Sequence, residues 1–252
     1  MLRLAVVVRA LSAYNAPRHK AYVRREREPR PWDKFVGAEF VYGVSPVHSA
    51  LRSNRRKIHS LFTESDPPLE IAGLCEELGV PIVAQPKGRL QEAISQPRAV
   101  HQGLALCCEA LEFELLESAA ANNGRNMWLA LDEVQDPRNF GAILRSARFF
   151  GVPVVSCAKN SAPLSPVASK ASAGAMEEVV VYEARNLVKF LAKSKENGFR
   201  VLGASLSKGK TDHRVLALRD VDVDVPTIVV LGSEGTGLRT NVLFATSLPS
   251  TP

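Results

Sequence analysis

From residue 127 onward, short apolar runs alternate with amphipathic stretches that repeat at a helical period. Short apolar runs are typical of buried strands, and the amphipathic stretches are typical of helices packed against them. Strands and helices that alternate over short connections form crossover units, so the pattern predicts an α/β fold with a parallel sheet. The predicted elements are strand 127–134, helix 139–150, strand 152–157, helix 186–196, strand 200–204 and strand 227–231.

The helix predicted over 139–150 has one apolar face and one arginine opposite to it. Pro137 cannot lie inside a helix and Asn139 is a good cap residue, so we expect the helix to begin near Asn139. At about 100° per residue, Arg145 falls on the far side of the helix, where the core does not need it. Both a solvated arginine and a functional one fit this position. The apolar stripe consists of Phe140, Ile143, Leu144, Ala147 and Phe150.

Residues 36–109 predict a second, smaller domain of mixed α/β type. Paired prolines precede one helical stretch, and Gly79 ends it before an apolar run. Residues 110–126 mix acidic and small side chains, which is typical of a linker. The elements predicted in this domain are helices at 47–51 and 69–78 and strands at 81–84 and 104–108.

Composition agrees with two globular domains. The chain has 252 residues, of which 46% are hydrophobic and 23% charged, close to ordinary globular usage. No run approaches the roughly 18 apolar residues that a membrane-spanning helix needs. The four cysteines form no CxxC pair and lie in apolar runs, so we expect reduced thiols in the core. They are Cys75, Cys107, Cys108 and Cys157.

Positive charge is concentrated near the N-terminus. Residues 1–57 hold 13 Lys and Arg against 4 Asp and Glu, and residues 1–25 hold six basic side chains and no acidic one. Basic residues interspersed with small apolar ones are typical of a mitochondrial presequence, which we predict within the arm 1–35. A basic arm without targeting function and a secretory signal are the alternatives.

A second basic feature lies inside the smaller domain. Arg52, Arg55, Arg56 and Lys57 place four positive charges in six residues. Such a cluster can neutralise phosphates, so these residues are candidates for RNA binding. A solvated basic helix face explains the cluster equally well.

Ligands of parallel sheets bind beyond the carboxyl ends of the strands, and the loop after residue 231 is rich in glycine. Gly232, Gly235 and Gly237 read G-x-x-G-x-G, which differs from the dinucleotide fingerprint G-x-G-x-x-G. No Gly-Lys-Ser/Thr follows, so a P-loop is excluded. The loop is either a plain turn or a site where a nucleotide-like ligand approaches the backbone closely.

Together the two loops resemble the SpoU branch of the SPOUT superfamily, the RNA ribose 2′-O-methyltransferases. The family's Asn-x-Gly-x-x-x-Arg motif is matched by Asn139, Gly141 and Arg145, and its Gly-Ser-Glu-Gly-x-Gly-Leu motif by residues 232–238. The likeness covers about residues 36–242. Three further segments share it: 42–47 (YGVSPV), 101–103 (HQG) and 170–175 (KASAGA).

The resemblance implies a SPOUT methyltransferase domain over 127–252 behind an RNA substrate-binding domain over 36–109. It implies S-adenosylmethionine as cofactor, rRNA as substrate, a homodimer, and no metal or membrane partner. Asn139 and Arg145 would lie at the methyl-transfer site. An arginine is a poor base, so we favour a phosphate grip for Arg145, with a general-base role as the alternative. The implied cofactor-binding residues are Leu231, Gly232, Glu234, Gly235 and Gly237, with Glu234 holding the loop.

With the basic arm, the resemblance implies 2′-O-methylation of a ribose in large-subunit rRNA in the mitochondrial matrix. The family's third motif, Ser-Leu-Asn-Val, has no match in residues 241–252, where Ser247 and Leu248 are followed by Pro249. We therefore expect a truncated methyltransferase domain in which the family's trefoil knot and cofactor pocket are incomplete. A catalytically impaired protein that only binds RNA is the alternative function.

Overall fold

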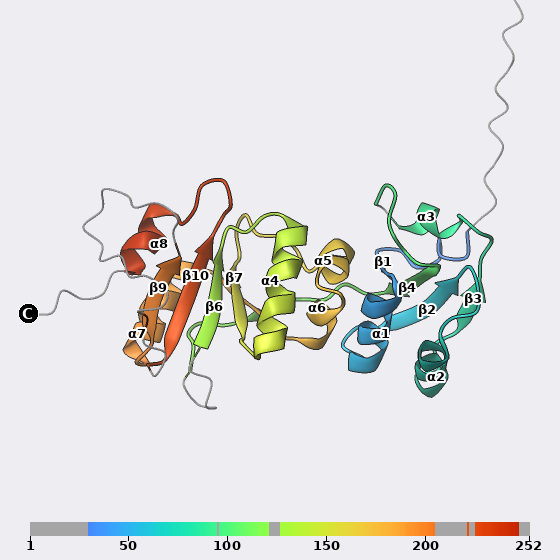
Figure 1. Cartoon of the computed structure of the whole chain (residues 1–252), viewed down its shortest axis with the longest axis horizontal. Helices are drawn as coiled ribbons and strands as arrows, with labels where there is room; N and C mark the ends of the chain where they lie inside the picture. The colour runs from blue at the N-terminus through green and yellow to red at the C-terminus, as the bar shows by residue number, and fades with distance from the viewer. Residues whose placement is uncertain (1–29, 95, 121–126, 205–220, 222–224, 247–252) are drawn as a thin grey trace, which may run out of the picture.

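The protein folds into two α/β domains, each built on its own sheet (Figure 1). The computed structural model describes residues 30–94, 96–120, 127–204, 221 and 225–246. The predicted presequence 1–25 and the tail 247–252, on which the expectation of a missing third motif rests, lie outside the described residues. No helix among the described residues is long and apolar enough to span a membrane.

The N-terminal domain has a four-stranded mixed sheet in the order β1-β4-β2-β3. Strand β4 runs antiparallel to both β1 and β2, whereas β3 is parallel to β2. Helices α1 and α2 pack on one face, and α3 packs with Trp32 on the other. The elements are β1 Glu39–Tyr42, α1 Val44–Ser53, β2 Ile58–Thr63, α2 Leu69–Glu77, β3 Ile82–Ala84, α3 Leu90–Ala93 and β4 Leu104–Cys108.

The C-terminal domain has a six-stranded, all-parallel sheet in the order β5-β8-β7-β6-β10-β9, as its alternating pattern predicts. Its strands are β5 Glu114–Leu115, β6 Met127–Asp132, β7 Val154–Cys157, β8 Val181–Ala184, β9 Arg200–Ala204 and β10 Thr227–Gly232. Its helices are α4 Pro137–Phe150, α5 Pro166–Ala171, α6 Ala175–Glu178, α7 Leu187–Glu196 and α8 Thr240–Ala245.

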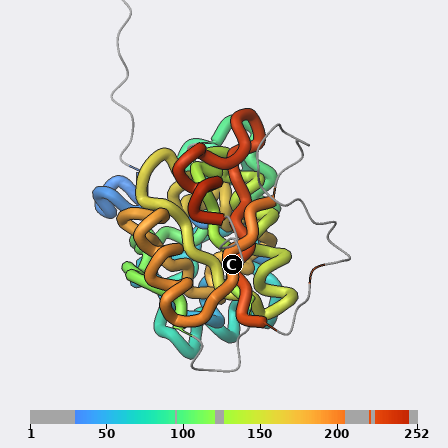
Figure 2. Tube along the Cα trace, turned by 90° about the vertical axis from the view of Figure 1, so that its left-hand side faces the viewer, coloured from blue at the N-terminus to red at the C-terminus, as the bar shows by residue number. Residues whose placement is uncertain are grey.

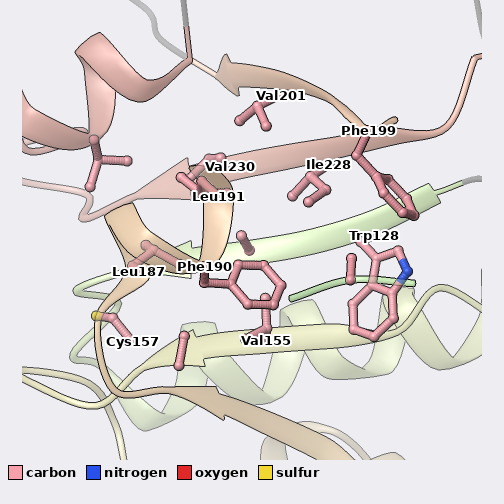
Figure 3. Close-up of a cluster of buried hydrophobic side chains, with 14 residues drawn as sticks. Trp128, Val155, Cys157, Leu187, Phe190, Leu191, Phe199, Val201, Ile228 and Val230 are labelled. Atoms are coloured by element: carbon pink, nitrogen blue, oxygen red, sulfur yellow. The ribbon is translucent and has the colours of Figure 1, made fainter. Parts of the chain in front are cut away.

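Both faces of the parallel sheet are covered, which is why its strands are almost continuously apolar. Helices α7 and α8 pack on one face, around Phe190, Trp128 and Ile228 (Figure 3). Figure 2 looks onto the end of the molecule where these two helices lie. Helices α4, α5 and α6 pack on the other face, around Leu131 and Phe140. The four cysteines are buried and free, as predicted.

Three details of the predicted elements are wrong. Helix α4 begins at Pro137, and Asp136 caps it by accepting a hydrogen bond from the Arg138 amide at 2.7 Å. Proline suits the first helical position, where its missing N–H has no partner to lose. Phe150 lies outside the buried stripe and is 73% exposed. The segment expected to be only a linker contributes β5, which pairs with β8.

Candidate active site

The two loops that carry the family motifs meet because their strands are neighbours. Strand β10 pairs with β6 in parallel register, and Gly232 lies opposite Asp132. The carboxyl ends of both strands therefore open at the same edge of the sheet, as the sequence predicts. The start of α4 and the glycine-rich loop share this edge (Figure 1).

Asn139 lies in the first turn of α4, and Arg145 lies further along the same helix. Asn139 is half-buried, whereas Arg145 is exposed on the side away from the core. Among the described residues, neither side chain has a hydrogen-bonding or ionic partner. The polar groups of both side chains are therefore available to a ligand.

Gly141, the glycine of the first motif, is fixed by packing. A Cβ at this position would lie 2.5 Å from the Ala168 carbonyl oxygen and 2.7 Å from the Ala171 Cβ. Helix α5 thus lies against the backbone of α4 at this point, and a side chain would push the two helices apart. The close approach holds the first turns of α4 in place.

The glycine-rich loop is a tight turn closed by its own backbone. The Ser233 amide donates to the Gly237 carbonyl at 3.1 Å, and the Gly237 amide donates back at 2.8 Å. A Cβ on Gly232 would lie 2.3 Å from the Gly237 carbonyl carbon, so only glycine fits there. Gly235 has open space around it. Among the described residues, the amides of Glu234, Gly235 and Thr236 donate to no other backbone group.

Glu234 does not hold this loop in the way the resemblance implies. Its side chain is exposed and has no partner among the described residues. Asp132 and Arg239 anchor the loop instead, a pair that the motifs did not indicate. The Arg239 Nε and backbone amide donate to the buried Asp132 carboxylate at 2.7 and 2.9 Å. A charged residue placed directly at the end of an apolar strand is the only sequence signal for this pair.

The pair also affects the ionisation of Arg239. Burial lowers the pKa of Arg239, but the hydrogen bond and the charge of Asp132 outweigh it, and the pKa is raised overall. Arg239 therefore stays charged. It connects the end of β6 to the start of α8 across the base of the loop. Among the described residues, no group of three or more His, Cys, Asp or Glu could hold a metal ion.

The side chains of the basic segment proposed for RNA binding have partners within the protein, and Arg56 is not available to a phosphate. The Arg56 side chain is 0% exposed and is paired with Glu177 of α6. Arg55 donates to the Val179 carbonyl. Arg52 and Lys57 are more exposed, but each forms an ion pair, with Glu178 and Glu109 respectively. The segment lies at the contact between the two domains.

A separate apolar hollow of about 470 Å³ lies beside α4, on the face of the sheet formed by β6 and β10. Met127, Ile143, Phe150 and Leu231 line it. Leu231, predicted to bind the cofactor, thus faces this hollow. The lining carries no charged side chain, so the hollow by itself offers no group for proton or phosphate chemistry.

Comparison with known proteins decides the family. The SpoU rRNA Methylase family matches residues 126–248, and the RNA 2′-O ribose methyltransferase substrate binding family matches residues 40–114. The 23S rRNA (guanosine-2′-O-)-methyltransferase RlmB of Acinetobacter baylyi is 32% identical over 210 residues, which are 80% of this chain and 82% of RlmB. The chain belongs to the SpoU rRNA methylase family.

Other relatives of this SpoU chain carry a mitochondrial name. The human protein "rRNA methyltransferase 1, mitochondrial" is 32% identical over 232 residues, which are 84% of this chain and 65% of the human protein. A Dictyostelium discoideum protein of the same name is 42% identical over 123 residues, 48% of this chain and 23% of that protein. The chain thus spans less than two thirds of these two relatives.

Solved structures agree with the SpoU fold. The rRNA methyltransferase from Sinorhizobium meliloti superposes with a TM-score of 0.65 at 20% identity, over 86% of this chain and 79% of that one. The SpoU methyltransferase AviRb from Streptomyces viridochromogenes, solved with the cofactor AdoMet, gives 0.62 at 15% identity over 89% and 86%. At these identities the likeness establishes the SPOUT fold, as the motifs predict.

Proposed function

We propose that this chain is an S-adenosylmethionine-dependent methyltransferase that acts on a ribose 2′-hydroxyl of rRNA. The observation that carries the proposal is the parallel register of β6 and β10, which opens the α4 start and the glycine-rich loop at one edge of the sheet. A ligand in the loop and an RNA held by Asn139 and Arg145 can then meet. Relatives named as rRNA methyltransferases support the same reaction.

The loop suits a nucleoside cofactor. Its turn is held without help from a ligand, its free amides can donate to one, and the absence of a Cβ on Gly235 and Gly237 lets a flat ring approach. Gly232, Gly235 and Gly237, with the neighbouring Leu231, would hold S-adenosylmethionine. The bound cofactor supplies an electrophilic methyl group.

The protein's own task is to place the 2′-oxygen in line with that methyl group and to accommodate its proton. Arg145 carries the planar, permanently charged donor set that suits a phosphate next to the target ribose. Asn139, which lies six residues before it on α4, can orient the hydroxyl through its amide. The N-terminal domain supplies the remaining contacts to RNA.

Methyl transfer to rRNA from labelled S-adenosylmethionine, followed by mass spectrometry of the nucleosides, tests this function. We expect 2′-O-methylnucleosides from the wild type and none detectable in the same reaction time from Arg145→Ala or Arg145→Lys. Arg185→Ala removes an exposed arginine elsewhere in the same domain and should leave the products unchanged. Methylated bases, or binding of rRNA without any methylation, would overturn the proposal; the second result would support a protein that only binds RNA.

A homodimer is part of the same proposal. Phe149 and Phe150 are 82% and 73% exposed beside the hollow at α4, and adjoining apolar groups of this kind mark protein interfaces. A second copy of the chain, as the family resemblance implies, would cover them. Sedimentation of the wild type should give a dimer, and Phe149→Ser with Phe150→Ser should give a monomer. A monomeric wild type would contradict this assignment.

Targeting to the mitochondrial matrix completes the proposal. Its support is the six basic and no acidic residues within 1–25 and the mitochondrial names of two relatives. Residues 1–35 fused to a fluorescent reporter should enter mitochondria and resist external protease after the outer membrane is opened. A variant with Arg3, Arg9 and Arg18 changed to Gln is the control and should remain in the cytosol. Cytosolic fluorescence from the unchanged fusion would refute the targeting.

A further inference from the structure

The contact between the two domains contains a buried ion pair. Arg56 follows α1 of the N-terminal domain, and Glu177 lies in α6 of the C-terminal domain; both side chains are 0% exposed. The Arg56 Nε and Nη2 donate to the two Glu177 carboxylate oxygens at 2.7 and 3.1 Å. The remaining nitrogen, Nη1, donates to Glu39 at 3.0 Å and to the Glu109 carbonyl at 2.9 Å. The guanidinium is therefore satisfied from both domains.

A second ionic cluster lies next to the first, around Glu178. One Glu178 oxygen accepts from Ser49 at 2.8 Å and from Arg52 at 2.6 Å, both on α1. The other oxygen accepts from Arg148 of α4 at 3.0 Å. One carboxylate thus connects the N-terminal domain to the helix that carries Asn139 and Arg145.

Close backbone contacts accompany the charges. Gly174 precedes α6, and a Cβ there would lie 2.6 Å from the Ser49 Oγ and 2.8 Å from the Ser45 carbonyl oxygen. The Lys170 ammonium donates to Gln102 at 3.0 Å, and the same Gln102 oxygen accepts from the Val44 amide. The three shorter segments that resemble the SpoU family, 42–47, 101–103 and 170–175, all meet at this contact.

We propose that Arg52, Arg56, Arg148, Glu177 and Glu178 form a domain lock that fixes the N-terminal domain relative to α4. The inference rests on the proposed function. These five are positioning residues, because none of them reaches the methyl-transfer loops. The lock holds the RNA-binding domain at one distance and angle from Asn139 and Arg145, so that RNA bound by the one domain presents its ribose to the other.

The chemistry of the contact favours a lock over a sliding surface. A bidentate pair between a guanidinium and a carboxylate is satisfied in only one relative orientation. A buried charge that loses its partner is strongly disfavoured, so intermediate orientations are not populated. Apolar contacts alone would tolerate small shifts between the domains, because they have no direction.

Distances between spin labels test the lock without relying on methyl transfer. The four native cysteines are buried, so labels can be confined to Glu77→Cys on α2 and Lys189→Cys on α7, two exposed sites in different domains. Two lock variants, Arg56→Met and the pair Arg52→Met with Arg148→Met, are compared with wild type. Lys57→Met is the matched control, because Lys57 is adjacent in the chain and its partner Glu109 belongs to the same domain.

We expect one narrow distance distribution in wild type and in Lys57→Met, and a broadened one in both lock variants. If Arg56→Met does not fold, the Arg52 and Arg148 pair decides, since both arginines are half-exposed. Unbroadened distances in every lock variant that folds, or a broad distribution in wild type, would overturn the lock.

Kinetics then test the positioning role. In the lock variants, kcat should fall by at least about tenfold from wild type, because misplacement of the reacting groups slows methyl transfer. The Kd for rRNA should stay within about threefold of the wild-type value. Unchanged kcat with broadened distances would overturn the positioning role. If wild type itself transfers no methyl group, the proposed function fails, and the distance measurement still decides whether the domains are locked.

Discussion

Two arginines of this chain have opposite environments. Arg56 belongs to the most basic segment among the described residues, yet its side chain is fully buried against Glu177. Arg145 shares an amphipathic helix with Arg138 and Arg148, yet it is exposed and has no partner among the described residues. The three arginines of the basic segment therefore serve the contact between domains, whereas Arg145 is free to bind RNA. A high density of charged residues along a sequence does not identify a binding surface until the partners of those residues in the folded protein are known.

The electrostatics of the two sites differ in the same way. Burial lowers the pKa of Arg56, but the hydrogen bond and charge of Glu177 outweigh burial and raise it overall. The acidic groups around Arg56 thus compensate the loss of water around its charge. Exposed Arg145 has water in place of such groups and can exchange it for a phosphate at little cost.

The largest effect is expected at the exposed arginine. Arg145→Ala should lower kcat by about a thousandfold, because a charged contact made in the transition state is lost. The free energy of unfolding should change by less than about 0.5 kcal/mol, because the side chain lies off the core. Single-turnover methylation and denaturant unfolding measure the two quantities. A destabilised variant would show that Arg145, like Arg56, supports the fold, and would contradict the contrast between the two arginines.

The buried arginine should behave in the opposite way. Arg56→Met should lower the free energy of unfolding by about 3 kcal/mol or more, because Glu177 is left as an unpaired buried charge. Replacing both residues, with Arg56→Met and Glu177→Leu, should recover much of that loss. Urea unfolding of the three chains measures the effect. Equal stability of Arg56→Met and wild type would contradict the buried pair.

Acid should weaken the domain contact through Glu178. Burial raises the pKa of Glu178, but the contacts with Ser49, Arg52 and Arg148 lower it by a larger amount. The pKa therefore lies below the ordinary 4.5. Because the pKa of Glu178 is lower in the folded state, its ionisation stabilises the fold fully above pH 4.5. This stabilisation is lost as the pH falls through the pKa of the folded state. We expect a contribution on the order of 1 kcal/mol, measured as the pH-dependent difference in stability from Glu178→Gln. A constant difference from pH 6 to pH 3 would argue against it.

The smallest effect is expected at an exposed pair. Lys57 is 71% exposed and is paired with Glu109. Lys57→Met should change the free energy of unfolding by about 0.5 kcal/mol or less, since solvent screens such pairs. It should also leave the affinity for rRNA within a factor of about two if the basic segment is not a phosphate-binding site. A clear loss of rRNA affinity without loss of stability would restore the RNA-binding role to this segment.

Local sequence patterns were enough to predict much of the catalytic domain. Its period of apolar runs predicted β6, α4, β7, α7, β9 and β10, because burial on both faces makes parallel strands recognisable without their neighbours. The parallel order then required the Asn139 turn and the Gly232 loop to open at one edge. The exposed position of Arg145 also followed from helical spacing alone. These features depend on residues close together in the chain, where periodicity is informative.

The partners of the charged residues, in contrast, become apparent only in the folded structure. Arg56 and Glu177 are 121 residues apart, and Arg239 and Asp132 are 107 residues apart. No local pattern distinguishes Arg56 from its exposed neighbour Lys57, so the sequence could not tell a domain lock from a phosphate-binding site. Strand β5 escaped prediction for a similar reason, since two residues show no period and are ordered only by pairing with β8. Burial of a charge is a property of the assembled fold, because its partners come from distant elements that only folding brings together.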